Sequence, residues 1–307
     1  MKLLIADKLH EDGIKVFLDN GFEITKSYTI IKEDLKKEIG KYDGIVVRSR
    51  TILTADVLEN AKNLKVIGRA GVGLDNIDLK KAEKLKIKVL NTPEAPSVSV
   101  AELTIGLILS IVRHISKADE TLHNGQWLKG DYMGYTVQGK KVGLIGFGNI
   151  GQAVAKRCAA LEMQIGVFDV VPEIIKTAET LGYKIYSSVD GLLQDAQIIS
   201  LHVPITPQTE NIINESKLKL MKKEAIIINT ARGGLIDEKA LVKALENGDI
   251  AGAALDVYKE EPLKDESLIN CKKNLILTPH IGAQTEETQI QASVQIAEKI
   301  SNYLKNL

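Results

Sequence analysis

The sequence predicts an α/β protein made of two units, each a doubly wound parallel sheet covered by helices. Short apolar runs alternate with segments of helical spacing, which is the pattern of strands joined by crossover helices. The alternation occurs twice, on either side of a glycine-rich turn at residues 146–151. A chain of 307 residues is also long enough to give each unit its own core.

The elements of each unit follow from these runs. Strands of the first unit are expected at residues 3–6, 23–25, 44–47, 65–68 and 88–90, and helices at 11–19, 33–39, 55–60 and 79–85. Strands of the second unit are expected at residues 142–145, 164–168, 184–186, 197–203, 225–229, 251–256 and 275–277. Residues 123–139, rich in glycine and tyrosine, are expected to form a long irregular connection before the second unit's first strand.

The last helix decides the domain boundaries. Residues 286–304 have helical spacing, and we expect this helix to cross back onto the first unit. The expected domains are then residues 1–95, completed by 284–307, and residues 96–283. The alternative is a simple tandem in which the helix closes the second unit.

Composition excludes several classes of partner. Forty basic and forty acidic side chains cancel, so neither nucleic acid nor an anionic membrane surface is indicated. Two cysteines without metal-like spacing fit a reducing compartment and predict no metal site. The start of the chain is charged too early for a signal peptide, and the apolar segment 97–112 is too short for a membrane span. We therefore expect a cytoplasmic protein in which residues 97–112 form a buried helix.

The glycine fingerprint predicts a dinucleotide site. Gly146, Gly148 and Gly151 follow an apolar strand and precede helical spacing at 152–161, so they suit a tight turn, close approach of a pyrophosphate, and helix–strand packing. Asp169 ends the next strand, where its carboxylate can accept both ribose hydroxyls and repel a 2′-phosphate. NAD is therefore expected rather than NADP. A glycine-rich turn in some other α/β unit is the alternative.

An arginine, carboxylates and histidines follow strands of the second unit, at the edge where open α/β sheets bind ligands. Oxidation of a 2-hydroxy acid needs a base for the hydroxyl proton, a carboxylate that fixes the imidazole, and a guanidinium that holds the substrate carboxylate. The candidates are His202, Arg232, Glu260, Glu261 and His280. From the residues alone, either histidine could be a structural residue, the arginine could pair with an acid, and the glutamates could be solvated.

Asp256, at another strand end, could accept from the nicotinamide carboxamide or from a nearby backbone donor.

These motifs together resemble the D-isomer-specific 2-hydroxyacid dehydrogenase family. The resemblance rests on the fingerprint with Asp169, His202-Val-Pro, Thr230-Ala-Arg-Gly, Leu255-Asp-Val with Glu261-Pro, and Pro279-His-Ile-Gly-Ala, in the family's order. It implies a flavodoxin-like substrate domain and a Rossmann NAD-binding domain with the active site in the cleft between them. It also implies a homodimer built around the helix from Ser97, for which a buried element of the chain's own core is the alternative.

The resemblance assigns roles to residues by motif. Arg232 would bind the substrate carboxylate, Glu261 would support the histidine, and His280 would be the acid/base, which leaves Glu260 as an exposed neighbour. The expected NAD-binding residues are Val72, Gly146, Gly148, Asn149, Ile150, Gly151, Asp169, His202, Val203, Pro204, Thr230, Ala231, Arg232, Asp256, His280, Gly282 and Ala283.

The first unit predicts a substrate with a second anion. Only six basic residues are arginines, and Arg48 and Arg69 both end strands there. The loop from Gly71 to Asn76 lacks a third glycine and is interpreted as an anion-binding loop. The expected substrate-binding residues are Arg48, Ser49, Arg69, Gly71, Val72, Gly73, Arg232 and His280. The pattern is similar to that of family members that oxidise 3-phospho-D-glycerate to 3-phosphohydroxypyruvate.

Two alternatives remain. A member acting on glyoxylate, hydroxypyruvate or D-lactate would leave Arg48 as a surface residue. A non-enzymatic NAD-sensing protein would use the same fold without turnover. Because the sequence stops after its last helix, feedback through a C-terminal regulatory domain is not expected.

Overall fold

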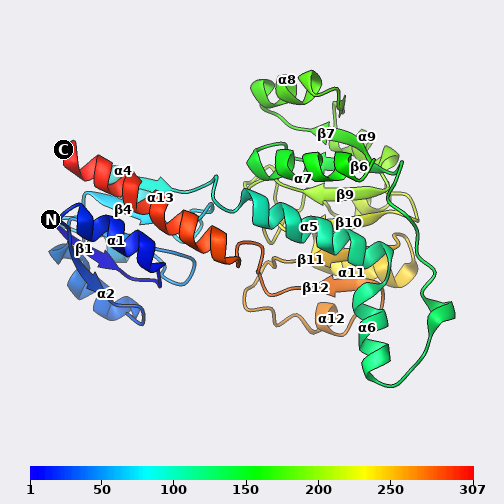
Figure 1. Cartoon of the computed structure of the whole chain (residues 1–307), viewed down its shortest axis with the longest axis horizontal. Helices are drawn as coiled ribbons and strands as arrows, with labels where there is room; N and C mark the ends of the chain where they lie inside the picture. The colour runs from blue at the N-terminus through cyan, green and yellow to red at the C-terminus, as the bar shows by residue number, and fades with distance from the viewer. The chain divides into compact units, whose positions relative to one another are not determined.

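The computed structural model describes residues 1–307 and divides them into two compact units. Unit 1 consists of residues 1–96 and 283–307, and unit 2 consists of residues 97–282. Both are α/β units with parallel sheets, so the predicted fold class is confirmed. Figure 1 labels the helices and strands of both units along the chain.

Unit 1 is a five-stranded parallel sheet with the strand order β2-β1-β3-β4-β5. Its elements are β1 (Lys2–Ile5), α1 (Glu11–Asp19), β2 (Glu23–Lys26), α2 (Lys32–Glu38), the 3-10 turn η1 (Ile39–Lys41), β3 (Gly44–Val47), α3 (Ala55–Leu58), β4 (Val66–Arg69), α4 (Leu79–Lys84), β5 (Lys88–Asn91) and α13 (Glu286–Lys305). The strand order reverses between β1 and β3, where Leu3 pairs with Gly44. This reversal is the topological switch point, at which such sheets bind ligands.

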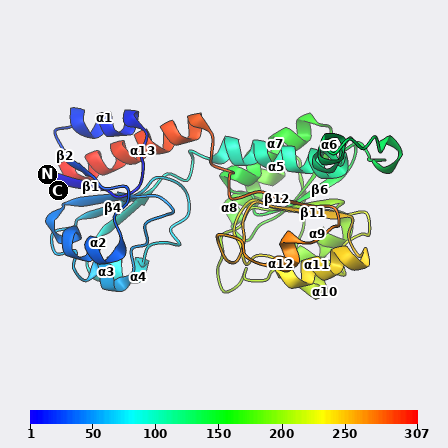
Figure 2. The ribbon, with the colours of Figure 1, turned by 90° about the horizontal axis from the view of Figure 1, so that it is seen from below.

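Helices cover both faces of this sheet, as Figure 2 shows, with α1 and α13 on one face and α2, α3 and α4 on the other. Under α1 and α13 the core contains Phe17, Ile296 and Ile300, all fully buried. The two helices approach closely because residue 13 is glycine: a Cβ there would lie 2.5 Å from the Ser293 carbonyl oxygen. The last helix is therefore an integral part of unit 1.

Unit 2 is a seven-stranded parallel sheet with the order β12-β11-β10-β9-β6-β7-β8. Its strands are β6 (Lys141–Ile145), β7 (Gln164–Phe168), β8 (Lys184–Ile185), β9 (Ile198–Leu201), β10 (Ile226–Asn229), β11 (Gly252–Leu255) and β12 (Leu275–Leu277). Its helices are α5 (Ser97–Val112), α6 (Ile115–His123), η2 (Lys129–Asp131), α7 (Asn149–Ala160), α8 (Pro172–Thr180), α9 (Val189–Asp195), α10 (Glu215–Leu218), α11 (Glu238–Asn247) and α12 (Glu266–Ile269). The switch point of this sheet lies between β6 and β9.

Two apolar layers sandwich the seven-stranded sheet. One contains residues of α5 and α7, such as Ile108 and Val154, and the other contains residues of α9 and α11, such as Leu192 and Leu241. The four central strands β6, β9, β10 and β11 are buried along almost their whole length. Continuous apolar strands are typical of a parallel sheet covered on both faces.

Two local expectations need correction. The helix after the fingerprint begins at Asn149, three residues before the expected start, because Gly148 already serves as its N-cap. Helix α6 is an additional element, separated from α5 by Arg113 and by His114, which has the left-handed conformation. No single helix is long and apolar enough to cross a membrane, although α5 and α6, bent by 66°, would pass together by length and composition.

Candidate active site

The chain's own packing requires a glycine at two of the three fingerprint positions but not at the third. Gly146 has φ +96°, and a Cβ there would lie 2.5 Å from the His202 carbonyl oxygen. A Cβ on Gly151 would lie 2.4 Å from the Gly146 carbonyl oxygen. The chain itself therefore excludes side chains at both positions. Gly148 is different, because no atom lies within 4 Å of the place where its Cβ would be.

The open space at Gly148 fits a dinucleotide. Gly148 is the N-cap of α7 and has no side chain with which to cap it. The first N–H groups of a helix lack partners within the helix and attract anions through the helix dipole. The residues present thus fit an NAD pyrophosphate held over Gly148 by the N–H groups of Asn149 and Ile150.

Asp169 lies at the end of β7 with its carboxylate held by the backbone. It accepts hydrogen bonds from the N–H groups of Phe147 (2.7 Å), Val170 (2.7 Å) and Val171 (3.0 Å). These contacts fix a negative charge next to the fingerprint loop. Val170 is 78% exposed, so the surface beside this charge is apolar. The three backbone donors use three of the about four acceptor positions of the carboxylate, so in this arrangement Asp169 can accept from one ribose hydroxyl rather than from the two expected. Its fixed charge still suits a ribose with free hydroxyls better than a ribose carrying a phosphate.

His202 is unsuited to act as a base. It follows β9, its Nε2 lies 2.9 Å from the Ser200 hydroxyl, and its buried Nδ1 has no hydrogen-bond partner. Burial lowers the pKa of His202 to about 3. A group that stays neutral near pH 7 and is so weak a base cannot take a hydroxyl proton efficiently. The structure thus distinguishes the two histidines that the residue types left open.

His280 has the geometry of an acid/base. It lies three residues after β12, with φ +53°, an uncommon backbone conformation for a side chain of this kind. Its Nδ1 lies 2.8 Å from Oε2 of Glu261, its side chain is about half exposed, and Nε2 makes no hydrogen bond within the chain. A histidine fixed at one nitrogen and open at the other can exchange a proton with a bound molecule.

Glu261 is placed to stabilise a protonated His280. Its Oε1 accepts from the Tyr258 N–H at 3.1 Å, while its Oε2 faces the imidazole. Burial raises the pKa of the Glu261 carboxyl, but the hydrogen bond and charge of His280, the Tyr258 N–H and the charge of Arg232 together bring it below its ordinary value. The carboxylate therefore remains ionised near neutral pH.

Arg232 is close enough for its charge to act on Glu261. A glycine explains how the loop reaches this place: a Cβ on Gly233 would lie 1.8 Å from the Tyr258 carbonyl oxygen. The Asn229 side chain fixes the same loop, donating to the Arg232 carbonyl oxygen at 2.8 Å and accepting from the Ala231 N–H at 3.1 Å. Three residues from three strand ends, Arg232, Glu261 and His280, thus form one cluster.

Asp256 supports the loop that carries His280. It is 1% exposed and accepts from the Thr278 hydroxyl (2.6 Å), the Ile281 N–H (2.8 Å) and the Gly282 N–H (2.9 Å). Of the two roles considered for Asp256, the structure shows the contact with backbone donors.

Tyr258 is a supporting residue that the sequence reasoning missed. Its hydroxyl lies 2.8 Å from the carbonyl oxygen of Thr278 and 3.1 Å from that of Leu255, and its one hydrogen is shared between them. Burial is the main cause that raises the pKa of Tyr258 to about 12, so the hydroxyl remains a donor. The signal that could have found it is its position, two residues beyond Asp256 at the same strand end. Thr230 has a comparable contact, since its hydroxyl lies 2.8 Å from that of Thr104 on α5.

The expected substrate residues of unit 1 also follow strands. Arg48 comes directly after β3, partly buried, and Ser49 next to it is exposed. Arg69 ends β4, and its side chain occupies the space beside Gly71, where a Cβ would lie 1.5 Å from Arg69 Nη1.

The Gly71 N–H donates to the Thr92 hydroxyl at 2.8 Å, so it is not an open donor for an anion. The expected anion-binding loop is thereby reduced to the residues after Gly71, beginning with Val72 and Gly73.

Comparisons with known proteins agree with this site. A family model, D-isomer specific 2-hydroxyacid dehydrogenase, NAD binding domain, matches residues 105–282. The D-3-phosphoglycerate dehydrogenase of Methanocaldococcus jannaschii is 48% identical over 306 residues, which is 99% of this chain and 58% of that protein. The hydroxypyruvate reductase of Thermotoga maritima is 44% identical over 301 residues, 96% of each chain.

Solved structures agree as well. The crystal structure of the TT0316 protein from Thermus thermophilus has a TM-score of 0.89 at 33% identity, covering 100% of this chain and 97% of that one. The chain spans somewhat more than half the length of the D-3-phosphoglycerate dehydrogenases that it matches. It belongs to the D-isomer-specific 2-hydroxyacid dehydrogenase family, and unit 2 contains the NAD-binding domain of that family.

Proposed function

We propose that this protein is an NAD-dependent dehydrogenase that oxidises 3-phospho-D-glycerate to 3-phosphohydroxypyruvate, the first step of the phosphorylated route to serine. The observation that carries the proposal is the His280–Glu261 pair, with Arg232 beside it, in the same unit as the dinucleotide fingerprint. The name of the M. jannaschii relative supports the choice of substrate.

Each member of the cluster has one role in this reaction. Bound NAD supplies the hydride acceptor, nicotinamide C4. Arg232 holds the substrate carboxylate, and Nε2 of His280 takes the proton of the 2-hydroxyl as the hydride leaves C2. Glu261 stabilises the imidazolium that results, at 2.8 Å from Nδ1. Arg48 and Arg69 are proposed to bind the phosphate, since a guanidinium suits phosphate recognition.

A substrate panel tests this proposal. Purified protein is assayed with NAD or NADP and with 3-phospho-D-glycerate, D-glycerate or D-lactate. We expect the highest kcat/KM for 3-phospho-D-glycerate with NAD. Arg48→Met should raise KM for that substrate roughly tenfold or more, as loss of a charge-assisted contact does, and leave KM for D-glycerate almost unchanged. Equal kcat/KM for D-glycerate and its phosphate would refute the substrate assignment.

The second candidate is reduction of hydroxypyruvate. It is favoured by the 44% identity to the T. maritima hydroxypyruvate reductase. The reverse assay distinguishes it, with NADH and either 3-phosphohydroxypyruvate, hydroxypyruvate or glyoxylate. The proposed function predicts that the phosphorylated keto acid is the best of the three.

His280→Asn separates an enzyme from a non-enzymatic NAD sensor. Loss of a general acid/base should lower kcat by roughly 10²–10⁴-fold. NADH binding, followed by its fluorescence, should fall far less than kcat, because the fingerprint loop is untouched and His280 is only one of the residues expected to contact the cofactor. A kcat within a few-fold of the unmodified protein would mean that another group takes the proton.

The proposed enzyme is a cytoplasmic homodimer. Exposed apolar side chains gather on α5, α6 and the connection to β6, including Val98, Leu122, Trp127 (80% exposed) and Met133 (87% exposed). Apolar groups at such exposure favour an association surface. Both cysteines are free, and burial raises the pKa of the Cys158 thiol to about 12, which suits a reducing compartment. Sedimentation of the protein and of Trp127→Ser tests the dimer.

A further inference from the structure

A buried carboxylate occupies the switch point of the five-stranded sheet. Asp7 lies two residues after β1, and Arg48 lies directly after β3, the two strands between which the order reverses. Asp7 is only 4% exposed. Because the carboxyl ends of strands at a switch point form the usual ligand crevice, what Asp7 binds determines what remains for a ligand.

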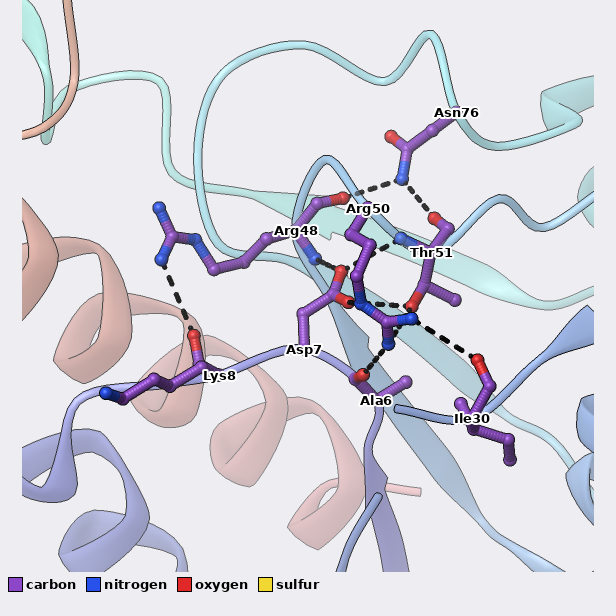
Figure 3. Close-up of polar contacts among 8 residues, drawn as sticks. All are labelled: Ala6, Asp7, Lys8, Ile30, Arg48, Arg50, Thr51 and Asn76. Carbon is purple, nitrogen blue, oxygen red and sulfur yellow. Dashed lines mark hydrogen bonds and ion pairs between the residues drawn. The ribbon is translucent and has the colours of Figure 1, made fainter. Parts of the chain in front are cut away.

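Three hydrogen bonds and one ion pair engage the Asp7 carboxylate, as Figure 3 shows. Oδ1 accepts a hydrogen bond from the Thr51 hydroxyl at 2.7 Å and forms an ion pair with Arg50, whose Nε lies 3.0 Å away. Oδ2 accepts from the N–H groups of Arg48 at 2.6 Å and Thr51 at 3.2 Å. A carboxylate has about four acceptor positions, so hydrogen bonds use three of those on Asp7, and the Arg50 guanidinium lies against the oxygen that has the fourth.

The two arginines beside Asp7 are in opposite situations. Arg50 donates from Nη2 to the Ala6 carbonyl oxygen at 2.6 Å and from Nη1 to that of Ile30 at 3.3 Å, in addition to its contact with Asp7. The Arg48 guanidinium makes a single hydrogen bond, to the Lys8 carbonyl oxygen, at the long distance of 3.5 Å. In Figure 3 it points away from the Asp7 carboxylate. Arg50 is thus fully engaged, and Arg48 is nearly free.

The backbone that carries both arginines is fixed separately. The Asn76 side chain donates to the carbonyl oxygens of Arg48 at 2.7 Å and Thr51 at 2.6 Å (Figure 3). The loop can therefore keep its path when one arginine side chain is changed. This allows the guanidinium contacts to be tested without removing the whole loop.

Charge makes the arrangement consequential. Burial lowers the pKa of Arg48, and the charge of Asp7 opposes that shift, so Asp7 lies near enough to attract the Arg48 guanidinium. With Arg50 on the carboxylate, one negative and two positive charges leave a net positive site. Without Arg50, Asp7 would have an open acceptor and an uncompensated charge, and the Arg48 side chain is the nearest cation shown to feel it.

We propose that Arg50 is a positioning residue that occupies Asp7 and thereby keeps the Arg48 guanidinium available for the second anionic group of the substrate. The identity of that group, a phosphate, rests on the proposed function. The competition between Arg50 and Arg48 for Asp7 does not depend on the proposed function, because it involves only residues of this chain.

A chemical probe tests the competition without any substrate. Phenylglyoxal modifies free guanidinium groups, and peptide mass spectrometry gives the rate at each arginine. In the unmodified protein Arg48 should react faster than Arg50. In Arg50→Met, Arg48 should react roughly fivefold more slowly, because it pairs with Asp7. Arg157, which pairs with Glu102 at 3.0 Å, is the internal reference.

A double variant provides the matched control. In Asp7→Asn/Arg50→Met the amide oxygen can still accept from the two backbone N–H groups and the amide nitrogen can donate to the Thr51 hydroxyl. Without a carboxylate to capture it, Arg48 should again react within about twofold of its original rate. If Arg50→Met leaves the rate at Arg48 unchanged or raises it, the proposal is wrong. Should that variant not fold, Arg50→Lys serves, with a smaller decrease expected in the same direction.

Kinetics then separate this proposal from the proposed function. Arg50→Met should raise KM for 3-phospho-D-glycerate about tenfold and leave kcat within about threefold, and the double variant should recover most of that loss. If the unmodified protein shows no preference for the phosphorylated acid, the proposed function fails, whereas the labelling still decides the role of Arg50. If the labelling is unchanged, the role of Arg50 fails whatever the substrate.

Discussion

Units 1 and 2 each have a buried carboxylate at the ligand edge of the sheet, but the charge of that carboxylate is compensated differently in the two units. In each, a buried carboxylate that follows one strand holds the loop that follows the neighbouring strand. Asp7 follows β1 and holds the loop after β3, whereas Asp256 follows β11 and holds the loop after β12. The groups in contact with the Asp256 carboxylate are all neutral, whereas Asp7 also forms an ion pair with the guanidinium of Arg50.

The difference matches what each loop is proposed to do. The loop held by Asp256 carries His280, which gains a positive charge in the proposed reaction, and no cation is among the groups that donate to Asp256. The loop held by Asp7 carries Arg48, for which a free carboxylate would compete with an anionic substrate. The role of a buried carboxylate at a strand end therefore depends on its partners. Asp256 has neutral partners, whereas the charge of Asp7 is balanced by Arg50.

The largest effect expected from this comparison is on stability. Asp256→Asn puts an amide NH₂ against a backbone N–H in either orientation, because the donors on both oxygens include one. We expect a loss of about 2–3 kcal/mol in the free energy of unfolding. Asp7→Asn can turn its NH₂ toward the Thr51 hydroxyl, and the half-exposed Arg50 can move into water, so about 1 kcal/mol is expected.

Urea denaturation of both variants measures this difference. If Asp7→Asn proves the more destabilising of the two variants, the proposed difference between the two carboxylates is wrong. The difference is supported if added salt changes the destabilisation caused by Asp7→Asn and not that caused by Asp256→Asn, since only Asp7→Asn removes the partner of a charged side chain.

A smaller effect is expected on NAD affinity, and it distinguishes the two glycines Gly148 and Gly146 of the fingerprint loop. Gly148→Ala meets no atom within 4 Å, so the midpoint of thermal unfolding without cofactor should stay within about 1 °C. Affinity for NAD should nevertheless fall roughly tenfold, about 1.4 kcal/mol, if a pyrophosphate lies there.

Gly146→Ala is the matched control within the same loop. Its φ of +96° and the 2.5 Å approach to the His202 carbonyl oxygen predict a lower unfolding midpoint even without NAD. Calorimetry with and without NAD distinguishes the two variants. If Gly148→Ala retained full affinity, the open space would have to be explained without the cofactor.

Much of this fold could be predicted because parallel strands buried on both faces are short apolar runs. β3, β7 and β12 have the expected bounds, and most other strands differ from expectation by one or two residues at their ends. The start of α7 was displaced because Gly148 caps the helix with its backbone alone, which helical spacing cannot reveal. Helix α6 was not foreseen although its apolar residues Ile115, Ala118 and Leu122 have helical spacing, and none of its residues is buried in the core of its unit.

The site was predictable where a residue's role follows from its type and strand position. Residue type could not distinguish His202 from His280, because burial and the partner on each ring nitrogen decide between them. Sequence could not find Asp7 or assign Arg50, since their importance lies in which donors fill one carboxylate. It also could not foresee that Thr92 would take the Gly71 N–H, a contact between residues 21 apart in sequence.

The smallest effect is the pH dependence of stability that Glu261 contributes through its pair with His280. The folded-state pKa of Glu261 is lowered, so its contribution to stability is present above the unfolded value, about 4.3, and is lost as pH falls through the folded pKa. Its side chain is 37% exposed, which limits that contribution to less than about 1 kcal/mol. Glu261→Gln should therefore be slightly less stable than the unmodified protein at pH 6, and the two should converge as pH falls below about 4.

Denaturation at a series of pH values measures this convergence. Glu260→Gln removes one charge from the same loop, but Glu260 is 74% exposed and its partner is the equally exposed Lys264, so it is the matched control. A difference for Glu261→Gln that grows as pH falls would mean that burial dominates and that the carboxyl is more stable protonated. Glu261 would then no longer be the carboxylate that stabilises a charged His280, and the role proposed for the His280–Glu261 pair would fail.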